Sequence, residues 1–464
     1  MRRLPRRRRP QPGLESRGEQ VPARSLQEAI DQAGSPVRLL WRQNAAPWTP
    51  PVLAPEYVGW RQEQGASNDS VALSDLSHHM SDLFIDGPDA MRLLSEYSAN
   101  DYEHFEVGQA KQFIAVNESG YLVSDGILMR DAEQRYTLSG APPAQNWIRH
   151  HGERAGYRVS FTADPDSAHR NGSDPVLFRY QVQGPQAQAI TARVFGGPFP
   201  ATKFFHSTPV TFAGHTLRAL RHGMTGQPGY EFIGPYERGA PLKEAFLTAG
   251  EEFGLVEVGG LAYSTNGIES GWIPTQTPAI YTSPELRSYR EDLSLHSYEG
   301  QKPLSGSFFS ENIEDYYCSP YELGYGRSID LDHDFVGRDA LAWKNHDRRR
   351  TKVTLVLDPD DVENIFGEDP GFVVSYGRYR VEHDSSTVGM TCHIGSIAPA
   401  GRLLALALVD EGRAAPGTEV TVIWGEHPGP GALPDADADF KEIRATVQVS
   451  PYNEYARTQY RRDP

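Results

Sequence analysis

Cysteine, long apolar runs and positive charge are all scarce in this sequence. Only Cys318 and Cys392 occur among 464 residues, and their wide spacing argues against a disulfide framework or a zinc site. No window approaches the 18 consecutive apolar residues of a transmembrane helix, so we expect no membrane partner. The 45 basic residues are outnumbered by 61 acidic ones, and the net charge of −16 argues against nucleic-acid binding. We therefore expect a cytoplasmic protein without a bound metal.

Positive charge is concentrated at the start of the chain, in the segment MRRLPRRRRPQPG. No apolar stretch follows these arginines, so the segment does not resemble a secretory signal. A nucleic-acid-binding arm and a disordered tail are the two readings of such a segment. We interpret residues 1–24 as a disordered, arginine-rich tail.

The following 300 residues alternate between strand and helix patterns. The segment SLQEAIDQAG carries the capping-box signals of a helix that begins after Ser25. An alternating strand, a Gly-Pro pair and a helical pattern then recur around 87–88, 184–185 and 234–235. Between the first two repeats, QFIAV, YLVSDGILMRD and QRYTLSG form the pattern of a β-meander. Residues 25–340 therefore predict an α+β region with antiparallel sheets.

Short strand patterns dominate the rest of the chain. TKVTLVLD, GRYRVEH, VGMTCHIG, LLALALV and TEVTVIWG follow one another, with turn residues between them. This texture predicts a small β-barrel over residues 341–455, followed by a polar tail at 456–464.

One carboxylate stands in unusual surroundings. Glu231 lies between Tyr230 and Phe232, directly after the glycine-rich loop RHGMTGQPG. The loop lacks a GK[ST] sequence and leads into a strand pattern, which argues against a phosphate site. A carboxylate among aromatic rings can accept two hydrogen bonds from the amidine-like edge of a flat heterocycle. The alternative is an ordinary exposed carboxylate on a strand.

Four ordered motifs resemble one superfamily. The segment RHGMTGQPGYEF at 221–232 resembles the R-x-G-x-T-G-x-x-G-[FY]-E signature of the glycine-cleavage T-protein superfamily. NESGYLVSDGIL, YELGYGRSIDLDHDFVGRDAL and VGMTCHIGSIAPAG resemble further T-protein segments in the same order. The resemblance implies two interwoven α+β folate-binding lobes with antiparallel sheets, plus a small C-terminal β-barrel, around a central folate channel. It also implies that Glu231 holds the pterin of tetrahydrofolate.

A fifth segment indicates the branch. AYSTNGIESGWIPTQTPAIYT, at 262–282, is similar to the tetrahydrofolate-dependent aryl O-demethylases, which include vanillate and syringate O-demethylases. The arginine that T-proteins carry before Glu269 is missing, and so is the Lys-Gly-Cys motif of the iron–sulfur assembly branch. The resemblance implies methyl transfer from a lignin-type or other aryl methyl ether to N5 of tetrahydrofolate. Aminomethyl or other methyl transfer to folate, and non-catalytic folate binding, remain the alternatives.

The resemblance also assigns the site residues. Tyr263 corresponds to the catalytic tyrosine, which would share a proton with the leaving phenolate; from the residues alone it reads as a packing aromatic. His79 joins it as a catalytic residue. The expected cofactor-binding residues are Gln112, Asp125, Gln181, Tyr230, Glu231 and Trp272. The expected substrate-binding residues are Trp48, Leu76, His79, Ala141 and Tyr263.

Three substrate positions depart from the family pattern, and one of them is Trp48, which falls near a tyrosine of that pattern. Relatives that act on aromatic acids carry, where this chain has Ala141, an arginine that pairs with the substrate carboxylate. Leu76 stands where they carry glutamine. An alanine cannot pair with a carboxylate, so we hypothesise a substrate less anionic than vanillate. The alternative is that another basic residue, such as Arg149 or His150, takes over this role.

Overall fold

The computed structural model describes residues 23–274, 276–433, 436 and 438–462, so most of the predicted arginine-rich tail lies outside the described residues. The first helix, α1 (Leu26–Ala33), begins where the sequence predicts. The Ser25 hydroxyl accepts a hydrogen bond from the Glu28 amide at 3.2 Å, and the Glu28 side chain completes the capping box. Gly34 ends the helix in the left-handed conformation, with φ of +84°.

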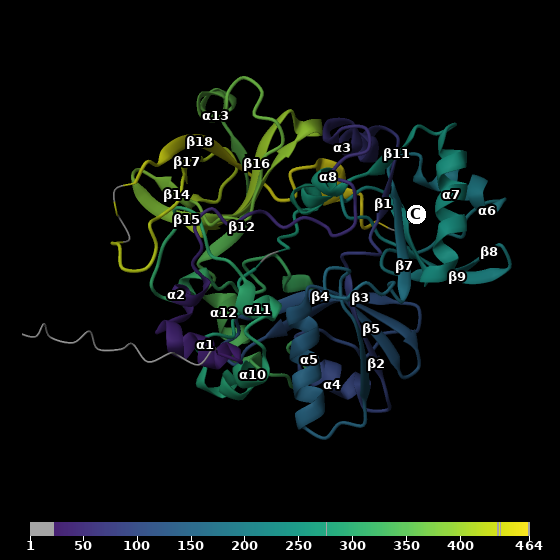
Figure 1. Cartoon of the computed structure of the whole chain (residues 1–464), viewed down its shortest axis with the longest axis horizontal. Helices are drawn as coiled ribbons and strands as arrows, with labels where there is room; N and C mark the ends of the chain where they lie inside the picture. The colour runs from purple at the N-terminus through teal and green to yellow at the C-terminus, as the bar shows by residue number, and fades with distance from the viewer. Residues whose placement is uncertain (1–22, 275, 434–435, 437, 463–464) are drawn as a thin grey trace, which may run out of the picture.

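Two antiparallel sheets are interwoven along the chain (Figure 1). The chain lays down one strand of the first sheet, builds the whole second sheet, and then returns to complete the first. The first sheet has the order β11-β1-β7-β10-β9-β8, and only its β1–β11 pair is parallel: β1 (Val71–Asp75), β7 (Leu177–Gln183), β8 (Ser207–Phe212), β9 (His215–Arg221), β10 (Gly229–Pro235) and β11 (Leu255–Val258). The second has the order β3-β4-β5-β2-β6: β2 (Ser81–Asp86), β3 (Ala110–Val116), β4 (Leu122–Ala132), β5 (Arg135–Gly140) and β6 (Ser160–Asp164).

Each predicted strand–Gly-Pro–helix unit is present. β2, β7 and β10 lead into α4 (Ala90–Glu96), α6 (Ala187–Phe195) and α7 (Gly239–Gly250). Gly87 has a φ of +145°, and a Cβ at this position would lie 2.2 Å from the carbonyl oxygen of Arg158. Only glycine fits such a turn. The turns therefore direct the helices onto their sheets, as Figure 1 shows for α7 on the first sheet.

The last quarter of the chain closes into a six-stranded barrel. Its strands follow the order β15-β14-β17-β18-β12-β16, and pairing of β16 with β15 closes the ring: β12 (Arg350–Leu357), β14 (Arg380–His383), β15 (Ser386–Ile397), β16 (Arg402–Asp410), β17 (Glu419–Trp424) and β18 (Lys441–Gln448). The predicted barrel is confirmed, although the sequence analysis did not identify β18. Among the described residues, none of the helices has the length and apolarity needed to cross a bilayer.

Candidate functional site

A cavity of about 2000 Å³ lies where the two sheets and the barrel meet. Two short helices, α8 (Gly260–Ser264) and α9 (Asn266–Ser270), contribute to its wall. These helices carry the demethylase-like segment singled out in the sequence. The predicted site residues that line this cavity are Trp48, His79, Gln112, Asp125, Ala141, Tyr263 and Trp272.

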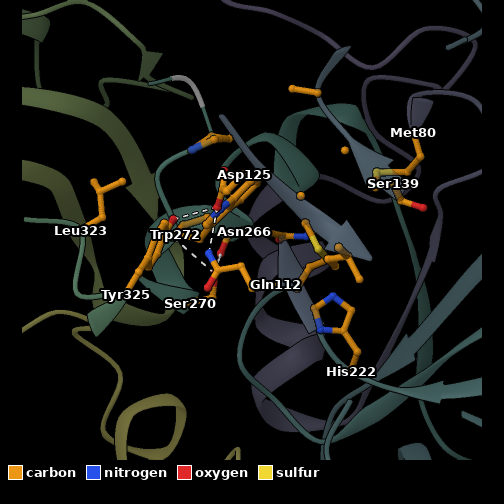
Figure 2. A pocket seen from close by; sticks show the side chains of 18 of the residues that line it. Met80, Gln112, Asp125, Ser139, His222, Asn266, Ser270, Trp272, Leu323 and Tyr325 are labelled. Carbon is orange, nitrogen blue, oxygen red and sulfur yellow. Dashed lines mark hydrogen bonds between the residues drawn. The ribbon is translucent and has the colours of Figure 1, made fainter. Parts of the chain in front are cut away.

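One end of the cavity, which we call the polar end, is organised around Asp125 (Figure 2). The Oδ2 atom of this carboxylate accepts hydrogen bonds from Gln112 Nε2 at 3.0 Å, Trp272 Nε1 at 2.9 Å and the Tyr325 hydroxyl at 2.9 Å. Burial raises the Asp125 pKa, and the three donors act in the opposite direction. The structure thus joins three predicted residues and adds Tyr325, which lies in the quoted segment YELGYG.

Glu231 and Gln181 lie side by side on β10 and β7, where they are register partners. Both are buried, and neither is among the residues that line the cavity. They lie behind its wall, since the amide nitrogen of the lining residue Met224 donates to Gln181 Oε1 at 2.8 Å.

A buried guanidinium fixes Glu231 and joins the two sheets. Arg179 on β7 donates to Glu231 Oε1 at 2.7 Å and, with its other terminal nitrogen, to both oxygens of Asp82 on β2 at 2.8 and 3.0 Å. It also donates to the Ser139 hydroxyl on β5 at 2.7 Å. The side chains of Arg179, Asp82 and Glu231 are each at most 5% exposed. A buried charge network of this kind is stable only when each partner is satisfied, so the position of Glu231 depends on both sheets.

The structure places two other predicted residues away from the cavity wall. Tyr230 occupies the opposite face of β10 from Glu231, because side chains alternate along a strand. Its ring packs in an apolar core, with its centroid 4.6 Å from that of Phe199. Leu76 is buried in a cluster that also contains Trp60 and Tyr263.

Several buried nitrogen atoms have no hydrogen-bond partner within the described parts of the chain, and three of them, Gln181 Nε2, His222 Nε2 and Asn266 Nδ2, lie in the cavity wall or directly behind it. His222 and Asn266 line the cavity, and Figure 2 shows Asn266 beside Asp125 and Trp272, with His222 farther along the wall. Buried polar atoms without partners are uncommon, so they indicate where a ligand could supply the missing bonds. His222 was not among the predicted site residues, although it belongs to the quoted glycine-rich loop.

The other end of the cavity, which we call the aromatic end, holds Tyr263, His79 and Trp48. The ring centroids of His79 and Tyr263 are 4.3 Å apart, and those of His79 and Trp48 are 5.9 Å apart. Burial lowers the pKa of His79 to about 3, so its imidazole is neutral at physiological pH. Burial also raises the pKa of Tyr263, and the charge of Glu231 adds to this effect, so the phenol stays protonated.

Ala141 lines the cavity at the residue that precedes helix α5 (Pro142–Arg154). The two basic residues considered as replacements for its missing cation lie elsewhere. Arg149 is half exposed and pairs with Glu153 at 4.0 Å, and His150 pairs with Asp292 at 2.8 Å. Among the described residues that line the cavity, neither of them is present.

The segment assigned to a C-terminal tail also reaches the site. Helix α14 (Glu454–Thr458) is followed by Tyr460, whose hydroxyl accepts from the Gly223 amide at 2.6 Å and donates to its carbonyl oxygen at 2.7 Å. Both Tyr460 and Gly223 line the cavity. The segment thus holds the glycine-rich loop in place.

Comparison with known proteins gives consistent results. Residues 44–278 match the model of the GCVT N-terminal domain. The chain is 36% identical to syringate O-demethylase of Sphingobium sp. (strain NBRC 103272 / SYK-6) over 452 residues, which cover 94% of this chain and 98% of that protein. It is 26% identical to sesamin methylene transferase of Sinomonas sp. (strain No.22), over 86% and 89% of the two chains.

A solved structure resembles the fold. The glycine cleavage system aminomethyltransferase T from Bartonella henselae superposes with a TM-score of 0.61 at 19% identity, covering 92% of this chain and 97% of that one. This likeness confirms the predicted arrangement of two interwoven α+β lobes with a C-terminal barrel.

Proposed function

The chain belongs to the GCVT family, and from this premise we propose that it is a tetrahydrofolate-dependent O-demethylase. It transfers a methyl group from an aryl methyl ether to N5 of tetrahydrofolate and releases a phenol and 5-methyltetrahydrofolate. We further place this reaction in the cytoplasm, within the catabolism of lignin-type aromatic compounds. The similarity to syringate O-demethylase over nearly the whole of both chains supports this choice.

The observation that carries the proposal is that the phenol of Tyr263 and the Asp125 cluster face one cavity. An aryl ether is a poor methyl donor, because its leaving group is a phenolate. The buried, protonated Tyr263 can donate a proton to that oxygen as the C–O bond breaks. N5 loses a proton as its bond to the methyl carbon forms, and return of that proton to Tyr263 by way of water restores the phenol, so charge and protons balance without a change of redox state.

Residues at the polar end fit tetrahydrofolate as the methyl acceptor. The unpartnered nitrogens of His222 and Asn266, which line the cavity, could form hydrogen bonds with polar atoms of the pterin. The Glu231 carboxylate, held by Arg179, would accept from the ring's amidine-like edge. Together they would hold the ring so that the methyl group lies in line between the ether oxygen and N5.

The neutral imidazole of His79 has a different task. Both of its ring nitrogens are buried without a hydrogen-bond partner in the part of the chain that the structure describes. Because the ring packs on Tyr263 and Trp48, it can position a methoxyarene against the phenol and accept a hydrogen bond from a ring hydroxyl.

The test is to incubate the purified protein with tetrahydrofolate and a methoxyarene and to quantify folate and phenol by mass spectrometry. We expect 5-methyltetrahydrofolate and the demethylated phenol in equal amounts. 5-Formyltetrahydrofolate, whose N5 is blocked, should give no turnover and serves as the control. Formation of 5,10-methylenetetrahydrofolate instead would assign the chain to methylene transfer, and release of phenol without any folate product would contradict the proposal.

A further inference from the structure

One histidine in the cavity wall has a buried nitrogen atom that the protein leaves without a bond. His222 directly follows β9 in the glycine-rich loop, lines the cavity and is 8% exposed. Its Nε2 atom has no hydrogen-bond partner among the described residues, whereas its Nδ1 atom lies 3.2 Å from the Tyr460 hydroxyl. What Nε2 offers to a ligand depends on which of the two ring nitrogens carries the proton.

The hydrogen bonds of Tyr460 determine the position of that proton. A phenol has a single proton, and Tyr460 donates it at 2.7 Å to the Gly223 carbonyl oxygen, which can only accept. The phenol oxygen accepts from the Gly223 amide at 2.6 Å and has a second lone pair for His222. Nδ1 is therefore the donor in the contact between His222 and Tyr460. In a neutral imidazole the other nitrogen then carries no proton, so Nε2 is an acceptor.

The imidazole is neutral because it is buried. Burial lowers the pKa of His222 below its ordinary value, the charge of Glu231 opposes this shift, and the charges of Arg461 and Arg179 add to it. The ring also packs against an apolar neighbour, since its centroid lies 5.4 Å from that of Phe205. The cavity wall thus contains an imidazole whose free nitrogen accepts a hydrogen bond and does not donate one.

The strand register places this acceptor near Glu231. Leu220 on β9 is the register partner of Glu231 on β10. Alternate side chains along a strand share a face, so His222, two residues after Leu220, continues the face that carries Glu231. Diagonal neighbours on paired strands lie about 7–8 Å apart. A pterin whose amidine-like edge binds Glu231 therefore has its remaining N–H groups in the vicinity of His222.

We propose that His222, held in this tautomer by Tyr460, selects the reduced pterin by accepting a hydrogen bond from an N–H group that only the reduced ring carries. The inference rests on the proposed function and names the feature of the folate that the site recognises. Tetrahydrofolate has N–H groups at N5 and N8, whereas folic acid has acceptor nitrogens at both positions. Two acceptors cannot bond to each other, so the oxidised ring leaves Nε2 unsatisfied. Tyr460 is a positioning residue in this arrangement.

The test measures binding and requires no turnover. By anaerobic calorimetry, we expect the wild type to bind tetrahydrofolate about 10- to 100-fold more tightly than folic acid. His222→Asn keeps a donor for Tyr460 but has no atom in place of Nε2, so it should reduce this ratio by about tenfold. His222→Gln places an amide oxygen near the position of Nε2 and should retain most of the ratio. His215→Asn, at an exposed histidine on β9, is the control and should bind both folates as the wild type does.

A second set of measurements tests the role of Tyr460. Tyr460→Phe removes the hydroxyl that fixes the tautomer, so the ratio should fall, and it should fall no further when this change is added to His222→Asn. Nuclear magnetic resonance of protein labelled with ¹⁵N-histidine reads the tautomer directly. The His222 signal, identified by its absence in His222→Asn, should show the proton on Nδ1.

A third folate assigns the donor. 7,8-Dihydrofolate has an N–H group at N8 and none at N5. Binding as tight as that of tetrahydrofolate would identify N8 as the partner of His222, and binding as weak as that of folic acid would identify N5.

The other outcomes overturn the inference. If the wild type carries the proton on Nε2, the site has no acceptor for the reduced ring. Equal weakening of both folates in His222→Asn would give this histidine a purely structural role, and unchanged affinities would place it outside the folate site. A wild type that binds none of the folates would overturn the proposed function as well. The expected folate selectivity without any methoxyarene turnover would count against the proposed function alone.

Discussion

The two ends of the cavity are built in opposite ways. At the polar end, a single carboxylate oxygen of Asp125 collects three hydrogen bonds from three separate segments of the chain. At the aromatic end, the rings of Tyr263, His79 and Trp48 pack on one another, and His79 has no hydrogen bond among the described residues. The difference shows that the Asp125 carboxylate is held by the protein before any ligand binds, whereas the His79 imidazole is left for the ligand to satisfy.

This contrast suits the two proposed substrates. A pterin is one invariant ring, so a preorganised set of hydrogen bonds can hold it at little entropic cost. Methoxyarenes vary in their substituents, and a pocket lined by aromatic rings selects them by shape. The chemistry is expected to depend on the aromatic end, and folate affinity on the polar end.

The largest effect should come from removing the phenol at the aromatic end. Tyr263→Phe keeps the ring but removes the proton donor, so kcat should fall by about 10²- to 10⁴-fold, the range of general-acid catalysis. Folate binding, measured by calorimetry, should be unchanged. Tyr376→Phe is the matched control, because it removes a neighbouring cavity phenol, and should retain most activity. Normal turnover by Tyr263→Phe would show that another group protonates the leaving phenolate.

The next effect concerns the carboxylate behind the polar end. Glu231→Gln removes the charge that Arg179 holds, so KM for tetrahydrofolate should rise by about 10- to 100-fold, the range of a hydrogen bond to a charged group. Steady-state kinetics at saturating methoxyarene measure this change. Tyr230→Phe alters the adjacent residue on the opposite face of β10 and should leave KM unchanged. Equal effects of the two variants would indicate a general disturbance of the strand.

A smaller effect should follow from loss of one donor to Asp125. Trp272→Phe keeps an aromatic ring in the wall but removes the indole N–H that donates at 2.9 Å. Because two donors to Asp125 remain, KM for tetrahydrofolate should rise only about 3- to 10-fold. Trp343→Phe, at a residue that is 60% exposed, provides the control. A decrease in kcat with unchanged KM would place Trp272 at the chemical step instead.

The smallest effect concerns the stability of the protein and a buried carboxyl group on helix α9. Glu269 on α9 is buried, and burial raises its pKa from 4.5 to about 8. Between these values the unfolded chain is ionised while the folded chain keeps the proton, so Glu269 reduces stability progressively as pH rises from 4.5 to 8. Glu269→Gln removes this penalty, so its Tm relative to wild type should increase with pH, by on the order of 5 °C over that window. A difference in Tm that does not change with pH would contradict a neutral Glu269.

Local signals allowed much of the fold to be predicted from the sequence. The capping box at Ser25 and the Gly-Pro turns act within a few residues, so they can be read without tertiary structure. Helix α3 (Trp60–Asp69) was not predicted from the sequence, because its buried face includes the polar residues Glu63 and Gln64. Their partners are distant: Glu63 accepts from the Gly259 amide, and Gln64 donates to Thr265 and to the Ser396 backbone oxygen.

The site residues also divide into those marked by local sequence signals and those that depend on contacts between distant segments. Sequence motifs identified Asp125, Trp272 and Tyr263, because each lies in a characteristic local pattern. The pairing of Arg179 with Asp82, 97 positions away, leaves no such pattern. Interactions between distant segments had to be seen in three dimensions.

The anchoring of Tyr460 to Gly223 has a practical consequence for work with this protein. The two residues are 237 positions apart, yet they form one piece of the cavity wall. Trimming the polar C-terminal segment to improve expression would thus alter the cavity wall. A fusion partner or purification handle joined there would begin close to the cavity, so kinetic comparisons call for handles placed elsewhere on the chain.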